Sequence, residues 1–505
     1  MLKRSILLFL MSNPRLSYVS DVEGCPLYWE KYLEFNDNVV KRDPTTGKLY
    51  MPEEETSFVF GGDCFDRGAG DISFARDLVQ LKKDYPDRVT LLLGNRDICK
   101  MKLTSEVPPG DHEKPEDVPQ PFFAGIYGTV PTYKDWIEEK GLKPSSISKL
   151  KWLLACTMSC PESFEFRRQE LGGDGITDEQ VYESFMGSLR PGGAVYEYIH
   201  HGQLAAIIDG TLFVHGGISV DNVGFVPDAA QLKEQLFEGT VPPGRSLVAE
   251  GRPAQDWVEA LNEFAKTQVA AWDRQPTYDA KGNRGGSALL AYPHRTSLPT
   301  TYGVVCCRMA RPALQYVDLK AVLYLNTSGV FRVLAGHMPT GDSPCVIQQP
   351  GLLSIIADTS YCDASGPNKN SRGKAIAEVL LYPDGRTRLR GRRKAGEPYD
   401  FYVNEEPLVG RCTQNGFWSK IVEKSDQEPE PKYLLHRTLD AYWSIEYKWM
   451  PHSEFEKELA EFSSSVGQGD TSGVTGSNPR PKSPTEVTKS PDGFKAKVKP
   501  ANATA

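Results

Sequence analysis

The 505-residue sequence lacks any apolar run long enough to cross a membrane. At the N-terminus, Lys3 and Arg4 precede a short apolar stretch that ends near Met11, as in a signal peptide. The following residues, 12–15, contain no small-x-small cleavage site. We therefore expect residues 1–15 to form an N-terminal extension, and we expect no membrane partner.

An excess of basic residues is also missing. Lys and Arg number 58 against 66 Asp and Glu, which gives a formal net charge of −8. A general nucleic-acid binder needs a basic surface, so we expect no nucleic-acid partner. A small anionic partner is still compatible with this charge, because bound cations invert the potential around a metal site.

The ten cysteines show no regular spacing, and no CxxC pair suggests a zinc site. The composition favours reduced thiols in a cytoplasmic protein, with disulfides as the alternative.

Short, continuous apolar runs recur along the chain, and each ends in Asp, Asn or His, most of them beside glycine. Such runs are typical of strands buried on both faces. Between them, Asp71–Asp84 has apolar residues at helical spacing. The combination predicts a layered α/β core, in which ligands bind where strands end. The runs are Leu16–Ser20, Ser57–Phe60, Val89–Leu93, Thr211–Val214, Phe331–Ala335 and Gly351–Ala357.

Other segments predict additions to this core. Turn residues between two apolar runs predict a hairpin over Lys374–Arg390. Aromatic residues in 393–462 predict a C-terminal helical extension, and polar 463–505 predicts a disordered tail. The core then spans 16–392, with insertions at about 98–205 and 221–300. Helices are expected in these insertions at Ser145–Met158, Asp178–Leu189 and Pro253–Trp272.

Potential metal ligands follow five of the predicted strands. Alone, each is more typical of a turn or a structural residue, but together they form an ordered set. Carboxylate, amide and imidazole groups suit Mn, Fe, Zn or Mg. One shared carboxylate would hold two ions about 3.5–4 Å apart, and such a pair can bind phosphate and activate water. The candidate metal ligands are Asp21, Glu23, Asp63, Asn95, His215 and His337.

These residues stand in blocks that resemble the ordered motifs of calcineurin-like metallophosphoesterases. The block Gly62–Gly68 is especially similar to that of phosphoprotein phosphatases and diadenosine tetraphosphatases. The resemblance covers roughly residues 16–100 and 205–360, and it implies a four-layer α/β/β/α sandwich with helical insertions. The other blocks are Asp21-Val-Glu23-Gly, Gly94-Asn-Arg-Asp97, His215-Gly and Gly336-His-Met-Pro.

The resemblance also implies roles for single residues. Asp63 would bridge two divalent ions, one bound also by Asp21 and Glu23 and the other by Asn95, His215 and His337. Asp358 would either support a metal-bound histidine or occupy a turn. The implied catalytic residues are Asp66, Arg67, Arg96 and Asp97, and the implied phosphate-binding residues are Arg67, Arg96 and Arg274.

Two residues depart from the family pattern. Glu23 replaces a histidine of the first block, which should favour a harder cation. Arg96 replaces the catalytic histidine of the third block. A guanidinium stays protonated near neutral pH, so Arg96 cannot act as a general acid, although it can stabilise negative charge. Either another group protonates the leaving group, or the substrate needs little protonation.

The sequence therefore predicts a phosphoesterase that hydrolyses a phosphomonoester or phosphoanhydride through hydroxide activated by two metal ions. The substrate would be a phosphorylated small molecule or a phosphoprotein. The alternative is a weakened phosphate-binding scaffold, a pseudophosphatase, which Glu23 and Arg96 support. A nuclease is disfavoured by the acidic composition.

Overall fold

The computed structural model describes residues 15–107, 130–235, 237–294, 297–310, 314–360, 370–439 and 445–466. The N-terminal extension predicted at 1–15 lies outside this part of the chain, except for its last residue. Most of the tail predicted at 463–505 also lies outside it, but its first four residues continue a helix that ends at Val466.

A seven-stranded mixed sheet forms one half of the core, with the order β16-β15-β14-β1-β4-β5-β6. Strands β1, β4, β5 and β6 run parallel, and β14, β15 and β16 continue the sheet antiparallel. Strands β14 and β15 confirm the predicted hairpin. The bounds are β1 (Leu16–Val19), β4 (Ser57–Phe60), β5 (Val89–Leu92), β6 (Gly202–Gln203), β14 (Ile376–Leu381), β15 (Thr387–Arg392) and β16 (Pro398–Tyr402).

A five-stranded sheet forms the other half, with the order β12-β13-β11-β8-β7. Its three central strands run parallel, and both edge strands are antiparallel to their neighbours. The bounds are β7 (Ala205–Ile208), β8 (Thr211–Val214), β11 (Arg332–Ala335), β12 (Cys345–Gln349) and β13 (Leu352–Ile356).

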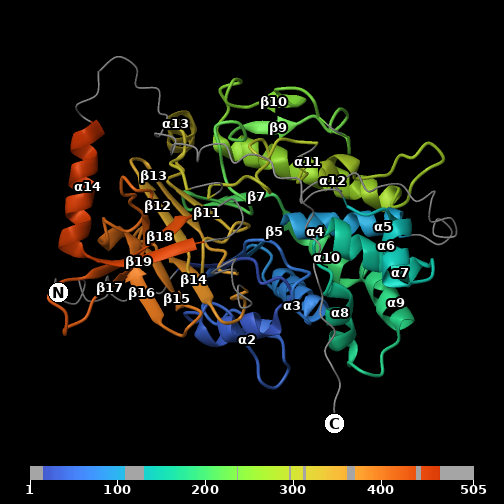
Figure 1. The fold of residues 1–505 in the computed structure, drawn as a ribbon. Helices are drawn as coiled ribbons and strands as arrows, with labels where there is room; N and C mark the ends of the chain where they lie inside the picture. The colour runs from blue at the N-terminus through green and yellow to red at the C-terminus, as the bar shows by residue number, and fades with distance from the viewer. Residues whose placement is uncertain are drawn as a thin grey trace, which may run out of the picture. The chain divides into compact units, whose positions relative to one another are not determined.

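The two sheets pack face to face. Tyr18 of β1 meets Phe213 of β8 with ring centroids 5.8 Å apart. Successive residues of β4 alternate in direction, because Val59 points to the other sheet while Phe58 and Phe60 point to the helices. Helices α2 (Pro26–Phe35) and α3 (Asp71–Asp84) lie on one side of the strands in Figure 1, opposite α11 (Ala254–Arg274) and α13 (Leu319–Thr327). The predicted α/β/β/α sandwich is confirmed.

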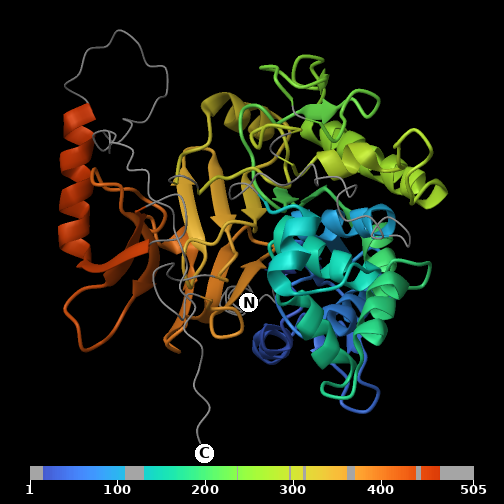
Figure 2. The ribbon, with the colours of Figure 1, turned by 45° about the vertical axis from the view of Figure 1, so that its right-hand side comes forward.

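The first insertion is helical, as predicted, and it gathers at one end of the sheets (Figure 2, cyan to green). Its last helix, α10 (Ala194–His201), packs on α3 and therefore belongs to the core. No helix in the described ranges is long and apolar enough to cross a bilayer. The remaining helices up to α9 are α4 (Asn95–Cys99), α5 (Leu103–Glu106), α6 (Tyr133–Lys140), α7 (Ser146–Trp152), α8 (Ser163–Leu171) and α9 (Asp178–Ser188).

The second insertion contains a long helix that confirms the one predicted at Pro253–Trp272. This helix buries apolar residues at helical spacing, among them Trp257, Leu261 and Trp272. Helix α13 follows after a loop. The elements of the second insertion are β9 (Phe225–Pro227), β10 (Gly244–Ser246), α11 (Ala254–Arg274) and α12 (Ser287–Ala291), and α13 spans Leu319–Thr327. Elsewhere, β2 (Lys41–Arg42) and β3 (Leu49–Tyr50) form a small two-stranded sheet.

The helical extension predicted at 393–462 is wrong. Strand β16 joins the large sheet, and three further strands form a separate antiparallel sheet. Aromatic residues such as Trp418 and Tyr447 lie on these strands, where aromatic side chains pack well. In the described part of this region, the helical segments are α14 (His452–Val466) and a short 3₁₀ helix at Val403–Glu405. The strands are β17 (Trp418–Glu423), β18 (Lys432–Thr438) and β19 (Ile445–Pro451).

Two glycines allow the strand ends to approach each other closely. A Cβ atom on Gly94 would lie 2.1 Å from Oδ1 of Asp63, and one on Gly336 would lie 2.1 Å from Oδ2 of Asp21. Both contacts are far below van der Waals distance. The missing side chains therefore let backbone from β5 and β11 lie against carboxylates that follow β4 and β1.

We predict that Gly94→Ala destabilises the fold by about 1–3 kcal/mol, a cost typical of overpacking. The backbone at Gly94 has φ −88° and ψ 173°, which alanine adopts readily, so the contact with Asp63 alone causes the loss. Denaturant unfolding measures it. The matched control is Gly187→Ala in α9, where an added Cβ meets open space and should stabilise by about 0.5–1 kcal/mol. Equal effects of the two changes would contradict this account.

Candidate active site

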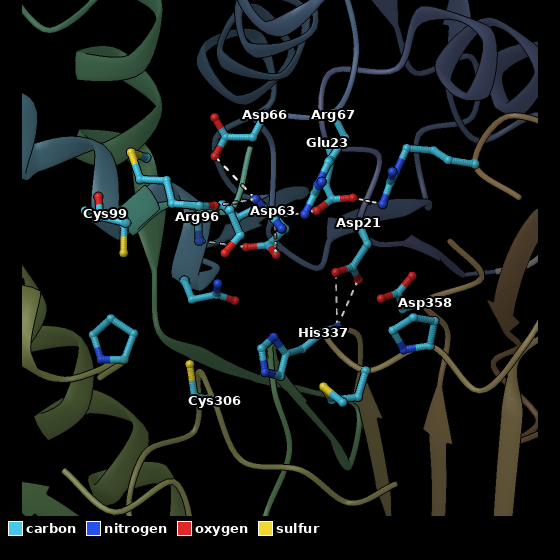
Figure 3. A pocket seen from close by; sticks show the side chains of 18 of the residues that line it. Asp21, Glu23, Asp63, Asp66, Arg67, Arg96, Cys99, Cys306, His337 and Asp358 are labelled. Atoms are coloured by element: carbon cyan, nitrogen blue, oxygen red, sulfur yellow. Dashed lines mark hydrogen bonds and ion pairs between the residues drawn. The ribbon is translucent and has the colours of Figure 1, made fainter. Parts of the chain in front are cut away.

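A cavity of about 600 Å³ opens at the ends of the central strands. It brings together residues that follow β1, β4, β5 and β11, and Figure 3 shows their side chains pointing toward one another. His215 follows β8 and lies beneath the cavity, fully buried. Five of the six predicted metal ligands line the cavity, namely Asp21, Glu23, Asp63, Asn95 and His337.

Backbone strain is concentrated here. Eight non-glycine residues of the described chain have a positive φ, and five of them are site residues. Such conformations cost about 1–3 kcal/mol each and persist where the surroundings impose them, commonly at functional sites. The strained site residues are Asp21, Glu23, Asp63, Asp66 and His337.

Three of the predicted ligands form a compact cluster. Potential ligand atoms of Asp63, His215 and His337 all lie within 4.8 Å of one another. Nδ1 of His215 lies 2.8 Å from the carbonyl oxygen of Gly61 and donates to it, which leaves Nε2 as the ligand atom. This Nε2 lies 3.3 Å from Oδ1 of Asp63.

Asn95 lines the same cavity and would complete the set. Oδ1 of Asn95 and the Nε2 atoms of both histidines are buried and have no hydrogen-bond partner within the described ranges. Buried polar atoms are normally satisfied, so three converging exceptions need an explanation. Two nitrogen and two oxygen donors fit one divalent cation of the Mn, Fe or Zn type. Asp63, Asn95, His215 and His337 are called the four-ligand set below.

The pKa values of the two histidines diverge. Burial lowers the pKa of His215, but Asp63 and Asp21 outweigh it and raise the value to about 10. Burial and the neighbouring His215 lower the pKa of His337 to about 3. Asp63 thus favours the charged form of His215, whereas burial favours the neutral form of His337.

Asp21 and Glu23 are already engaged. The backbone N–H of His337 donates to both oxygens of Asp21, at 3.1 Å each, and the hydroxyl of Ser20 donates at 2.5 Å. Burial raises the pKa of Asp21 to about 6. Glu23 forms ion pairs with Arg96 and Arg372. The metal site predicted at Asp21, Glu23 and Asp63 therefore does not present free carboxylates.

Asp66 lines the cavity, but its carboxylate is also bound. The ammonium group of Lys100, itself buried, pairs with Oδ1, and Nη1 of Arg96 lies 3.6 Å from Oδ2. Burial raises the pKa of Asp66, but the opposing effect of Lys100 and Arg96 is larger, so the pKa lies below its usual value. Asp66 is an ionised partner for these two cations.

Asp97, predicted as catalytic, does not reach the cavity. It is fully buried, and its carboxylate accepts the backbone N–H groups of Asp63, Cys64 and Gly94 at 2.7–3.0 Å. This carboxylate joins the loop after β4 to the loop after β5. Asp97 is thus a positioning residue that holds Asp63 in place.

The arginines fall into two groups. Arg67 and Arg308 line the cavity and form no ion pair with a described residue, whereas Arg96 is bound to Glu23. Arg274, predicted to bind phosphate, is exposed at the end of α11 and is not part of the cavity wall. A motif at the end of a helix does not fix the direction of the side chain.

Several residues of the site could not be predicted from the sequence. Arg308 and Arg372 lie in loops outside the recognised blocks, and Lys100 lies one helical turn after Arg96. No motif marks these positions. Asp358 does line the cavity, but it accepts the backbone N–H of Ser360 rather than supporting His215, whose partner is Gly61.

No protein-family model and no curated protein sequence matches this chain. Among solved structures, a cold-active protein tyrosine phosphatase of a Shewanella species is 14% identical, with 77% of this chain and 80% of that chain covered and a TM-score of 0.38. A serine/threonine phosphatase from Saccharomyces cerevisiae is 12% identical over 74% of each chain, with a TM-score of 0.31. The phosphatase domain of the Legionella effector WipB is 12% identical, with 65% of this chain and 100% of that chain covered and a TM-score of 0.30. These likenesses are too low to assign a function to this chain.

We predict that Asp97→Asn lowers the free energy of unfolding by about 1–3 kcal/mol, because an amide N–H₂ would then face backbone donors. The displaced Asp63 should also weaken Mn²⁺ binding by roughly 10–100-fold, as for other outer-shell changes. Urea unfolding and Mn²⁺ titration measure the two effects. Asp87→Asn, at an exposed position, is the matched control and should change neither. Wild-type Mn²⁺ affinity in Asp97→Asn would refute the positioning role.

Proposed function

We propose that this protein is a metal-dependent phosphoesterase that hydrolyses a phosphomonoester or a phosphoanhydride. The observation that carries the proposal is the four-ligand set, whose unsatisfied donor atoms converge beside a cavity. Arg67 and Arg308 lie in the same cavity wall. A cation next to two available guanidinium groups favours a tetrahedral anion such as phosphate.

Each part of the site has a role in this reaction. A divalent cation held by the four-ligand set would supply Lewis-acid chemistry and activate a water molecule for attack on phosphorus. Arg67 and Arg308 would bind the non-bridging oxygens of the phosphoryl group and stabilise charge on them in the transition state. Asp97 accepts hydrogen bonds from the backbone of Asp63 and Gly94, and Gly94 lets the two loops lie close together, so both residues position Asp63 and Asn95.

The chemistry of the leaving group limits the classes of substrate that suit this site. By the resemblance of its block, Arg96 replaces the histidine that would act as general acid, and its Nε lies 2.5 Å from Oε1 of Glu23. A guanidinium does not release its proton near neutral pH. Substrates whose leaving group needs little protonation, such as aryl phosphates or phosphoanhydrides, therefore suit this site best. A phosphotyrosine protein or a nucleotide polyphosphate belongs to these classes.

The cysteines support a cytoplasmic location for the reaction. The nine described cysteines form no disulfide with one another, and Cys64, Cys160 and Cys345 are buried as free thiols. Persistent free thiols are typical of a reducing compartment.

We predict that purified protein hydrolyses p-nitrophenyl phosphate with Mn²⁺ and that chelation abolishes turnover, because the four-ligand set holds the required cation. Re-addition of Mn²⁺ should restore the rate. Absence of chelator-sensitive turnover with Mn²⁺, Mg²⁺ and Zn²⁺ would favour a phosphate-binding scaffold, the alternative that Glu23 and Arg96 support.

Arg67→Met and Arg308→Met should each lower kcat/KM by roughly 10–100-fold, since each removes a charge-assisted contact worth about 1.5–3 kcal/mol. Arg274→Met is the matched control, and wild-type kinetics are expected because Arg274 is exposed away from the cavity. A large loss of kcat/KM in Arg274→Met alone would show that Arg274 binds the phosphate, as the sequence predicts, and would contradict the role proposed for Arg67 and Arg308.

We further predict that a phosphotyrosine peptide and a dinucleotide polyphosphate are hydrolysed faster than a phosphoserine peptide by about 10²–10⁴-fold, the usual contribution of a general acid. Single-turnover rates at saturating enzyme measure this without product release. Equal rates on all three substrates would show that another group protonates the leaving oxygen.

A further inference from the structure

Glu23 lies between two guanidinium groups. Oε1 of Glu23 is 2.5 Å from Nε of Arg96, and Oε2 pairs with Arg372. The glutamate side chain is only 6% exposed and that of Arg372 only 2% exposed. Each oxygen of this buried carboxylate therefore faces a guanidinium group, which offsets its buried charge.

Arg96 reaches beyond Glu23. Its Nε lies 3.6 Å from Oδ2 of Asp63, its Nη1 lies 3.6 Å from Oδ2 of Asp66, and its backbone N–H donates to Oδ1 of Asp63 at 3.0 Å. One guanidinium group thus faces three carboxylates. Figure 3 shows Arg96 among these acidic side chains. This is the place where a first metal ion, held by Asp21, Glu23 and Asp63, would have to lie.

The two halves of the centre differ in what their ligand atoms contact. On the side of the histidines, Nε2 of His215, Nε2 of His337 and Oδ1 of Asn95 have no hydrogen-bond partner in the described part of the chain. The charged group that faces Nε2 of His215 is the carboxylate of Asp63, at 3.3 Å. On the side of Glu23, the carboxylates face the guanidinium groups of Arg96 and Arg372. A second divalent ion would have to displace Arg96 from Glu23 and then lie next to two fixed positive charges, whose repulsion is weakly screened at a buried position.

We propose that the centre binds a single divalent cation at the four-ligand set, and that the guanidinium groups of Arg96 and Arg372 stand in place of the first metal of a dinuclear site. The inference rests on the proposed function and deepens it. It also accounts for both departures from the family pattern at once, because Glu23 provides the carboxylate that the guanidinium of Arg96 binds.

Arginine suits this role for physical reasons. A guanidinium keeps its charge at any physiological pH, is weakly hydrated, and matches carboxylate geometry. It can therefore neutralise Glu23 and Asp63 and stabilise the phosphoryl group electrostatically. It cannot lower the pKa of a bound water molecule as a metal ion does. Activation of the attacking water thus falls to the four-ligand set alone.

The decisive experiment measures how many ions one chain binds. Metal-free full-length protein is titrated with Mn²⁺, and bound metal is measured by elemental analysis and by electron paramagnetic resonance. The expected result is one Mn²⁺ per chain with the six-line signal of an isolated ion. Two Mn²⁺ per chain with an exchange-coupled signal would overturn the inference.

Variants assign the ion to its ligands. Outer-shell changes typically weaken metal binding by about 10–100-fold. His337→Ala removes a direct ligand and should therefore weaken Mn²⁺ binding by more than about 100-fold, whereas Glu23→Gln changes a residue outside the four-ligand set and should weaken it by less than about 10-fold. Circular dichroism establishes that each variant is folded. Equal losses in the two variants would place the ion on Glu23 and contradict the inference.

A double variant tests why the second ion is excluded. Arg96→Met combined with Arg372→Met frees Glu23, so a second Mn²⁺ and a coupled signal are expected. A folded double variant that still binds one ion would show that the arginines are not what excludes the second.

Failure of the inference and failure of the proposed function can be told apart. Two bound Mn²⁺ with chelator-sensitive hydrolysis would refute only the single-ion centre. A wild-type protein that binds no Mn²⁺ and shows no turnover would refute both.

Discussion

The burial of several carboxylates at one edge of two packed sheets is the constraint on which the rest of this structure depends. A buried negative charge is tolerated only when hydrogen-bond donors or cations compensate it. Backbone N–H groups compensate Asp97, and Lys100 compensates Asp66. Arginines compensate Glu23, whereas Asp63 faces an imidazole nitrogen. These compensations separate the scaffold of the site from the part that can bind a cation.

This division gives the centre its chemical character. A cation at the four-ligand set would lie beside a cavity wall that contains Arg67 and Arg308, and these two residues would add positive charge next to the proposed phosphate site. The same wall contains Cys99, which lies 3.5 Å from His294, and Cys306. The first insertion contributes Met158 and Glu162 to this wall.

Much of the core and of the cation site could be predicted from the sequence. Strands buried on both faces leave continuous apolar runs, and neighbouring parallel strands end at the same edge, so Asp63 and Asn95 had to lie close together. The pairing of Glu23 with Arg372 could not be predicted, because 348 residues separate the partners and no motif contains Arg372. The aromatic residues around Trp418 do not distinguish a helix from a strand, because buried aromatic residues occur in both, so the helical extension predicted for this region is wrong. The backbone role of Asp97 depends on the conformation of two loops, which its motif does not specify.

The central claim is that Asp63, Asn95, His215 and His337 converge on one divalent cation. Anomalous diffraction from crystals grown with Mn²⁺ tests it most directly. The account predicts one anomalous peak enclosed by these four side chains, with Arg96 still bound to Glu23. A peak beside Glu23, or no peak among the four side chains, would contradict it.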